Sequence, residues 1–115
     1  MELGQFSVSL TVKDIHVSLA FYQKFGFQII EGELDEKWVV LRKGEAVIGL
    51  FQDMFPKNIL TFNPADVRSV QADLKAAGIT FEKEAESGTG PASATLIDPD
   101  GNPILLDQHF DTPQA

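Results

Sequence analysis

The chain repeats one short strand, written Ile48-Gly-Leu-Phe-Gln52 and again, 56 residues later, Ile104-Leu-Leu-Asp-Gln108. A second repeat lies upstream of each strand. Asp14 and Gly26 bracket one amphipathic segment, and Asp66 and Gly78 bracket another with the same spacing, at an offset of 52 residues. Matched pairs in the same order at a nearly constant offset predict a tandem duplication.

Each copy contains one predicted helix between its aspartate and its glycine. Aspartate side chains cap helix N-termini, and glycine accepts the left-handed backbone that ends a helix. Alternating and apolar runs predict four strands per copy, at residues 6–12, 27–31, 37–42 and 46–52, and at residues 59–62, 79–82, 92–98 and 104–108. The unit is therefore βαβββ, present as module 1 (about residues 5–52) and module 2 (about residues 58–109) of a single domain, residues 1–115.

The two offsets differ by four residues, which we assign to the loop at residues 83–91. This segment is rich in Gly, Ser and Glu, and we interpret it as a mobile flap with a possible lid role. Its Ser-Gly-Thr-Gly run, residues 87–90, lacks the ending of a phosphate-binding P-loop.

Composition excludes several classes of function. The 115 residues include no cysteine, so disulfides and thiolate chemistry are excluded. A net charge of −8 opposes nucleic-acid binding and favours a cationic ligand, although ordinary solubility explains it equally well. The sequence shows no apolar run that could span a membrane and no leader, so we expect a soluble, cytoplasmic protein.

Three motifs resemble the glyoxalase, bleomycin-resistance and extradiol-dioxygenase superfamily, also called vicinal oxygen chelate. They are Val8-Ser-Leu-Thr-Val-Lys-Asp14, Ser18-Leu-Ala-Phe-Tyr22 with Phe25-Gly-Phe27, and Asp98-Pro-Asp-Gly-Asn102 before the last strand. The last motif also has a structural reading as a tight turn. The resemblance implies an α+β fold in which two tandem βαβββ modules form curved mixed sheets around a cavity.

In metal-dependent members the first and last strands of each module supply the metal ligands. Carried over to this chain, those positions hold Ser7, Gly49, Ile59 and Leu105. A divalent cation needs several imidazole nitrogens or carboxylate oxygens, and three of these four residues have no donor side chain. The resemblance therefore implies no metal and no other cofactor.

Strand alternation predicts which side chains line the cavity. If Val8, Leu10 and Val12 pack on the helix, the intervening residues face the cavity, and the repeat adds their counterparts. The ligand-binding candidates are Ser7, Ser9, Thr11, Phe51, Thr61, Asn63 and Asp107. The lining is mostly apolar with a few hydroxyl groups, which suits an organic ligand.

The leading hypothesis is a metal-independent binding protein for a small organic molecule, with no catalytic residue and with a homodimer implied by the resemblance. Two alternatives stay open: a metal-dependent lyase, isomerase or dioxygenase with an atypical site, and a non-enzymatic regulatory or interaction module. His16 is interpreted as an exposed helix residue and His109 as the end of the last strand; neither has a second histidine at a spacing that suggests shared metal binding. Met54 and Phe55 either pack within the module or contact a second subunit, and the face on which Trp38 lies stays undecided.

Overall fold

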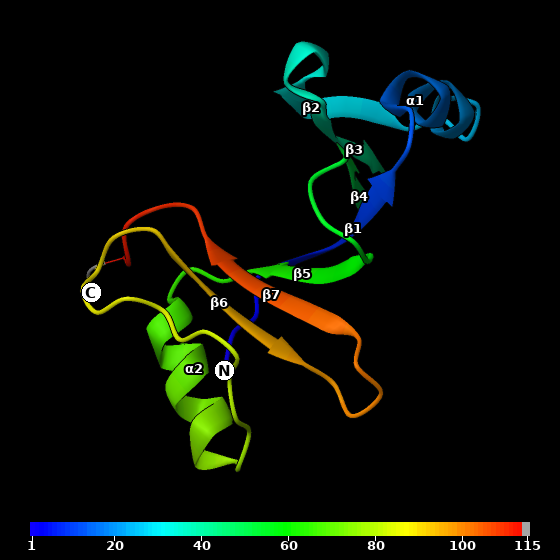
Figure 1. The fold of residues 1–115 in the computed structure, drawn as a ribbon. Coiled ribbons are helices and arrows are strands. Elements are labelled where there is room, and N and C mark those ends of the chain that lie inside the picture. Colours follow the sequence, from blue (N-terminus) through cyan, green and yellow to red (C-terminus); the bar gives the residue numbers. More distant parts are fainter. Residues whose placement is uncertain (114–115) are drawn as a thin grey trace. The chain divides into compact units, whose positions relative to one another are not determined.

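A computed structural model describes residues 1–113 and shows a mixed α+β fold with seven strands and two helices in that range (Figure 1). It divides into two compact units, which we call the module-1 unit (Ser7–Ile59) and the module-2 unit (Met1–Phe6 together with the chain from Leu60). The elements are β1 (Gln5–Val12), α1 (Ile15–Gln23), β2 (Gln28–Glu33), η1 (Leu34–Glu36), β3 (Trp38–Lys43), β4 (Ala46–Gln52), β5 (Ile59–Asn63), α2 (Val67–Ala76), β6 (Ala92–Ile97) and β7 (Pro103–Gln108). Cooperative behaviour of the two units as one domain stays a prediction.

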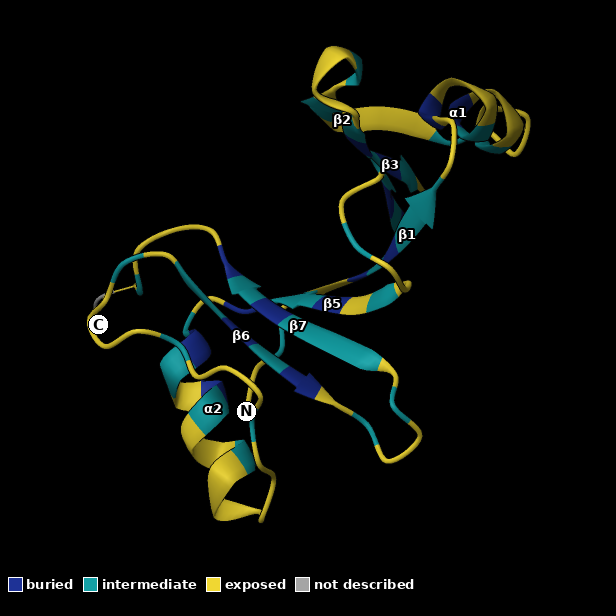
Figure 2. Cartoon of the chain, in the orientation of Figure 1, coloured by how far each residue is buried: buried dark blue, intermediate teal, exposed yellow. Residues whose placement is uncertain are grey.

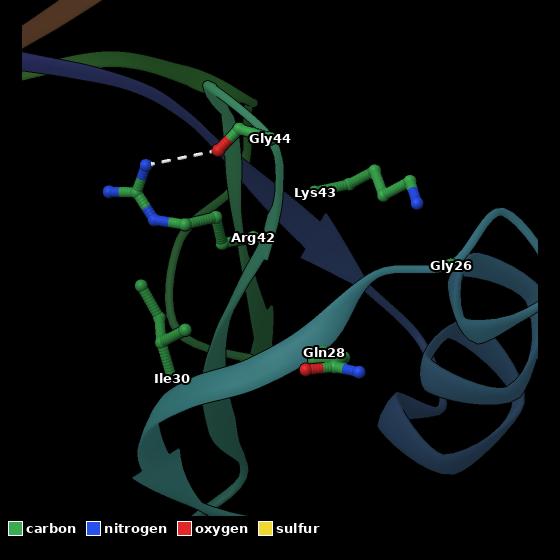
Figure 3. A pocket seen from close by; sticks show the side chains of 6 residues that line it. All are labelled: Gly26, Gln28, Ile30, Arg42, Lys43 and Gly44. Carbon is green, nitrogen blue, oxygen red and sulfur yellow. Dashed lines mark hydrogen bonds between the residues drawn. The ribbon is translucent and has the colours of Figure 1, made fainter.

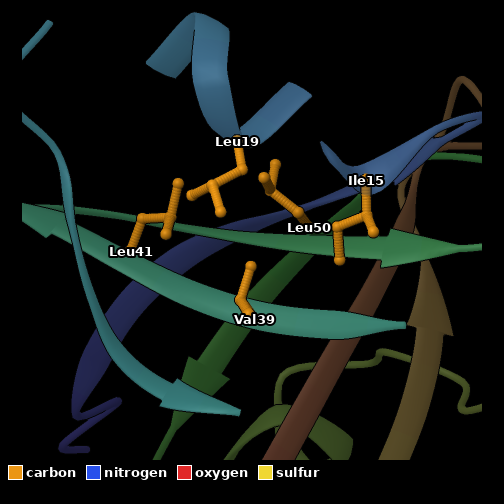
Figure 4. Close-up of a cluster of buried hydrophobic side chains, with 5 residues drawn as sticks. All are labelled: Ile15, Leu19, Val39, Leu41 and Leu50. Atoms are coloured by element: carbon orange, nitrogen blue, oxygen red, sulfur yellow. The ribbon is translucent and has the colours of Figure 1, made fainter. Parts of the chain in front are cut away.

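In the module-1 unit the strand order is β2-β3-β4-β1, with α1 packed on one face. The β1 and β4 strands run parallel, and the other neighbours run antiparallel, so the sheet is mixed. As predicted, the Asp14 carboxylate caps α1 by accepting from the backbone N–H groups of His16 and Val17. Figure 4 shows the core between helix and sheet, made by Ile15, Leu19, Val39, Leu41 and Leu50.

The module-2 unit repeats this plan with the strand order β5-β7-β6 and α2 on one face. Its β5 and β7 strands are parallel, and β6 and β7 are antiparallel. Asp66 caps α2 by accepting from the Ser69 N–H, as predicted. Figure 2 shows the buried positions of α2 and β7, and the core consists of Val67, Val70, Ala94, Leu96 and Leu106.

The duplication extends to a hydrogen bond that closes each module. The Gln52 side-chain oxygen accepts from the backbone N–H of Ile15 at 2.9 Å, and the Gln108 oxygen accepts from the backbone N–H of Val67 at 2.8 Å. Both glutamines end the last strand of their module, and both acceptors satisfy the first N–H of the helix, which has no partner within the helix itself. The repeated glutamine therefore makes the same contact in both copies.

Strand register divides the four inserted residues differently from the prediction. Leu41 pairs with Ile48 and Leu96 pairs with Ile104, so the offset is 55 residues at the third strand and 56 at the last. Because the helices have an offset of 52, three residues are inserted between the helix and the third strand of module 2. The fourth lies in the turn at residues 98–102, not in the loop at residues 83–91.

Module 2 departs from the predicted βαβββ pattern at residues 79–82, where no strand forms. The contact that remains is an isolated bridge between Lys83 and Thr95. Side chains of α2 instead hold the following segment: Arg68 donates to the carbonyls of Glu86 and Gly90 at 2.8 and 2.6 Å. Hydrogen bonds from α2 therefore hold the loop at residues 83–91 along that helix, and its lid role stays a prediction.

The Asp-Pro-Asp-Gly-Asn stretch forms the turn between β6 and β7, as its structural reading predicted. The Asp98 carboxylate accepts from the backbone N–H groups of Asp100 and Asn102 and from the Asn102 side chain at 2.7 to 2.9 Å. Gly101 has a φ of 88°, a conformation that glycine adopts without strain. Two hydrogen bonds from Asn102 lower the pKa of Asp98. The bond from the Asn102 side chain has the larger effect, and the bond from its backbone N–H comes second.

We expect Asp98→Ala to destabilise the protein at neutral pH and to lose this effect in acid. The pKa of Asp98 is lower in the folded state than in the unfolded state. The ionised carboxylate therefore stabilises the fold fully above the unfolded-state pKa, and this stabilisation disappears as the pH falls through the folded-state pKa. Urea denaturation of both proteins at a series of pH values measures the difference. Asp100→Ala is the control, since it removes a carboxylate from the same turn and keeps the acceptor; a difference independent of pH would contradict the assignment.

Candidate functional site

The face of the module-1 sheet that points away from α1 carries the predicted candidates in ordered rows. Leu10 and Val12 pack on the α1 core, so alternation turns Ser7, Ser9 and Thr11 to the other face, as predicted. Register aligns Thr11 with Phe51 and Phe51 with Trp38, and the next row contains Ser9, Gly49 and Val40.

Three aromatic rings form a cluster on this face. The Trp38 and Phe51 rings are stacked with centroids 6.2 Å apart and planes 4° apart, and the Phe55 ring lies 5.4 Å from Phe51. This cluster resolves the orientation of Trp38, which alternation alone had left open. It also shows that Phe55 packs within its own unit, whereas Met54 is exposed.

Hydroxyl groups border the aromatic cluster. The Thr11 hydroxyl donates to the Phe55 carbonyl at 2.8 Å, which holds the loop after β4 against β1. Ser7 and Ser9 are buried, as is Gly49 beside Ser9 in the second row. A side chain at position 49 would meet the Phe51 ring, because an added Cβ atom would lie 2.5 Å from Phe51 Cε2.

The module-2 unit has a separate polar cluster at the ends of β5 and β7. The Asn63 side chain donates to the Asp107 carbonyl at 2.9 Å, and His109 Nε2 lies 3.1 Å from the Asp107 carboxylate. His109 Nε2 also lies 3.3 Å from the Asn63 side-chain nitrogen, so the tautomer of the imidazole decides which of the two neighbours Nε2 hydrogen-bonds. The sequence did not point to His109 as part of a cluster, because its neighbour Asn63 is 46 residues away.

The remaining predicted residues lie apart from these clusters. Thr61 is buried beside Leu105 in the β5 and β7 register. His16 is exposed in the first turn of α1, as predicted.

A shallow pocket of about 310 Å³ lies at the other end of the module-1 sheet (Figure 3). It is lined by Gly26, Gln28, Ile30, Arg42, Lys43 and Gly44. Arg42 and Lys43 leave their strand in different directions, with Lys43 extending toward Gly26 and Arg42 donating to the Gly44 carbonyl at 3.2 Å. The two cations therefore do not converge on one anion.

Comparison with protein families assigns the chain. Residues 4–106 match the model of the glyoxalase/bleomycin resistance protein/dioxygenase superfamily, so the chain belongs to this superfamily. No curated protein matches the sequence.

Neither α1 nor α2 has the length and apolar run of a membrane-spanning helix.

Solved structures share the fold at low sequence identity. A superfamily member from Vibrio splendidus 12B01 has 20% identity and a TM-score of 0.69, with 90% of this chain and 97% of that chain covered. A protein described as NAD-dependent benzaldehyde dehydrogenase from Legionella pneumophila has 18% identity and a TM-score of 0.70, covering 90% and 98%. Methylmalonyl-CoA epimerase from Mycobacterium tuberculosis has 18% identity and a TM-score of 0.65, covering 95% and 92%. These similarities establish the fold and leave the activity to be argued from the site.

The residues at the superfamily's metal-ligand positions do not fit a divalent cation. Gly49, Ile59 and Leu105 carry no donor atom, and the Phe51 ring occupies the space that a longer side chain at position 49 would need. Within residues 1–113, no three His, Asp or Glu side chains converge as a metal-binding group. The Asp107 and His109 pair provides two donors in a different place, fewer than a structural or catalytic zinc site uses.

Proposed function

We propose that the protein binds a small, planar organic molecule without a metal, on the face of the module-1 sheet that carries Trp38 and Phe51. The observation that carries this proposal is the stacked Trp38 and Phe51 pair, bordered by the hydroxyl of Thr11. Aromatic side chains with a few polar groups are typical linings of small-molecule sites.

The size of the expected interaction follows from the rings. An aromatic pair contributes roughly 0.5 to 1.5 kcal/mol beyond the free energy gained by burying its surface area. A planar ligand that contacts both rings is therefore preferred over a non-aromatic one, and its affinity is moderate. The module-1 unit carries six basic and seven acidic residues, net −1, while the rest of the chain carries three basic and ten acidic residues, net −7. The preference for a cationic ligand that the total charge suggested is therefore weak at this face.

Trp38 is the only tryptophan, so its fluorescence reports directly on this site. We expect a thermal-shift screen of metabolites and drugs, run with EDTA and with added divalent metals, to give hits that do not depend on metal. Each hit should change Trp38 emission on titration, and Trp38→Ala should weaken binding measured by calorimetry by at least about tenfold, the equivalent of about 1.4 kcal/mol.

Phe110→Ala is the matched control, because Phe110 is an aromatic residue that is 81% exposed and lies in the module-2 unit. It should leave binding unchanged. Hits that bind Trp38→Ala and the original protein equally well would place the ligand elsewhere and overturn the proposal.

The alternative, metal-dependent catalysis at an atypical site, would need the Asp107 and His109 pair together with further ligands. Such an enzyme would purify with one Zn, Ni, Mn or Fe ion per chain and would lose thermal stability on chelation. Elemental analysis showing clearly less than one ion per chain excludes it. His109→Ala should lower the bound metal if this candidate is correct.

A further inference from the structure

The sheet face that carries Trp38 and Phe51 has a cation at its other end. Arg42 follows Trp38 by four residues in β3, so alternation places both side chains on one face, with their Cα atoms about 13 Å apart along the strand. The neighbouring cation lies elsewhere: Figure 3 shows Lys43 extending toward Gly26, which follows α1, and Arg42 pointing away from it. Arg42 is therefore the basic residue of β3 on the proposed binding face.

An apolar surface connects the aromatic cluster with Arg42. Val40 and Gly49 pair in the row between them. The Phe51 ring lies over Gly49, because an added Cβ atom there would be 2.5 Å from Phe51 Cε2. The aromatic surface thus extends to the middle row, and the Arg42 row follows after two residues, about 7 Å along the strand. The shallow pocket of about 310 Å³ borders Arg42 and leaves room for a small group there.

The duplicated module shows that the fold does not require a basic residue at position 42. At the offset of 55 residues that relates the third strands, the equivalent residue is Ile97. Arg42 Nη1 donates to the Gly44 carbonyl at 3.2 Å, which is a neutral acceptor for one of the five N–H donors of the guanidinium. Module 2 closes the equivalent turn with the Asp98 carboxylate instead. The turn itself therefore does not need the positive charge of Arg42.

The carboxylates around this face determine which way a charged ligand lies. The edge strand β2 pairs Glu33 and Glu31 with the first two rows of the face, and both are exposed. Gln28, which pairs with Arg42 in the third row, is uncharged. An anionic group is therefore repelled beside the first two rows and attracted in the third.

We propose that the ligand of this face is a planar aromatic carboxylate whose ring stacks on Trp38 and Phe51 and whose carboxylate binds Arg42. This inference rests on the proposed function and names its ligand class. The guanidinium presents paired N–H donors that match the two oxygens of a carboxylate. The distance between the Phe51 ring and the Arg42 row favours a carboxylate that is joined to the ring by a linker of a few atoms.

Three dansyl probes test the charge preference, because they share one aromatic ring system and differ in charge. At neutral pH dansylglycine is anionic, dansylamide is neutral and dansylcadaverine is cationic. Trp38 is the only tryptophan, and its excitation energy is transferred to a dansyl group bound beside it. We expect dansylglycine to bind at least about tenfold more tightly than dansylcadaverine, with dansylamide between them.

Arg42→Gln should weaken dansylglycine binding by at least about tenfold, the effect of losing a charge-assisted hydrogen bond, and should leave dansylamide binding unchanged. Arg42→Lys is a second variant that keeps the charge without the paired donors, so it should weaken dansylglycine binding less. Lys43→Gln is the matched control, since it removes a cation from the next position of the same pocket and should leave the order of the three probes unchanged. Thermal denaturation shows whether each variant is folded.

The outcomes separate this inference from the proposed function. Equal binding of the three probes, or an Arg42→Gln protein that binds dansylglycine as tightly as the original, overturns the carboxylate assignment and leaves the aromatic site in place. An equal loss in Lys43→Gln overturns the assignment too, because the effect is then one of net charge. The absence of energy transfer from Trp38 to any of the probes contradicts the aromatic site itself, and both proposals with it.

Discussion

Gln108→Leu is expected to lower the free energy of unfolding by about 3 kcal/mol. Gln108 is 1% exposed, and its side chain connects three parts of the module-2 unit. Its oxygen accepts from the first N–H of α2 at 2.8 Å, and its nitrogen donates to the Phe110 carbonyl at 2.6 Å and lies 3.2 Å from the Thr112 hydroxyl. Leucine has a similar size but leaves the N–H of the fully buried Val67 without its acceptor and removes the donor to the Phe110 carbonyl.

Gln52→Leu is the natural control for this prediction. Gln52 makes the same bond to the first N–H of α1, but it is only partly buried, so water can replace the lost acceptor. We expect a loss of about 1 kcal/mol, the usual net value of one hydrogen bond. Chemical denaturation followed by circular dichroism compares the two variants. Equal effects would show that burial and the additional bonds of Gln108 contribute nothing.

The second large effect is expected from the core leucines that the duplication relates, Leu50 and Leu106. They are 0% and 1% exposed and occupy equivalent positions in the last strand of each module. Truncation to alanine removes three buried carbons and leaves a cavity, which costs about 2 to 5 kcal/mol. Leu50→Ala and Leu106→Ala should therefore each destabilise the protein strongly.

This pair of variants also tests whether the two units fold as one domain. In a cooperative domain, either replacement shifts a single unfolding transition to lower denaturant concentration, as seen by Trp38 fluorescence and by circular dichroism alike. In independently stable units, Leu106→Ala would unfold the module-2 unit first and leave the Trp38 signal of the module-1 unit in place. Val17→Ala is a control with little expected effect, since Val17 is 67% exposed.

Local signals in the sequence predicted most of the fold. The capping aspartates, the glycines after the helices and the strand alternation all correspond to observed features, because each depends on neighbouring residues alone. Residues 79–82 were predicted wrongly as a strand. An apolar run predicts a strand only where a neighbour offers a full ladder of hydrogen bonds. Here the contact with β6 is confined to Thr95, which accepts from the N–H groups of Glu82 and Lys83, while the Ile79 N–H donates back to the Leu74 carbonyl of α2.

The sequence predicted on which face of the sheet the candidate side chains lie, but not which of them contact one another. Alternation placed Ser7, Ser9 and Thr11 opposite the helix, because side-chain direction along a strand has a fixed period. Trp38 could not be placed, since the start of its strand was predicted at residue 37 from a run with apolar residues on both faces. The closeness of His109 to Asn63, and of Phe55 to Phe51, depends on how a loop returns and on register between distant strands.

The contact between the Phe51 ring and Gly49 has a consequence for how this chain can change over generations. A single replacement at position 49 by a ligand residue such as histidine or glutamate meets the Phe51 ring before it can reach a metal. Replacements at positions 49 and 51 would be needed together. A replacement at 51 alone removes the Phe51 ring, and a replacement at 49 alone displaces that ring from its stack with Trp38. Packing against the Phe51 ring therefore opposes a metal ligand at position 49, in addition to the missing donor side chain there.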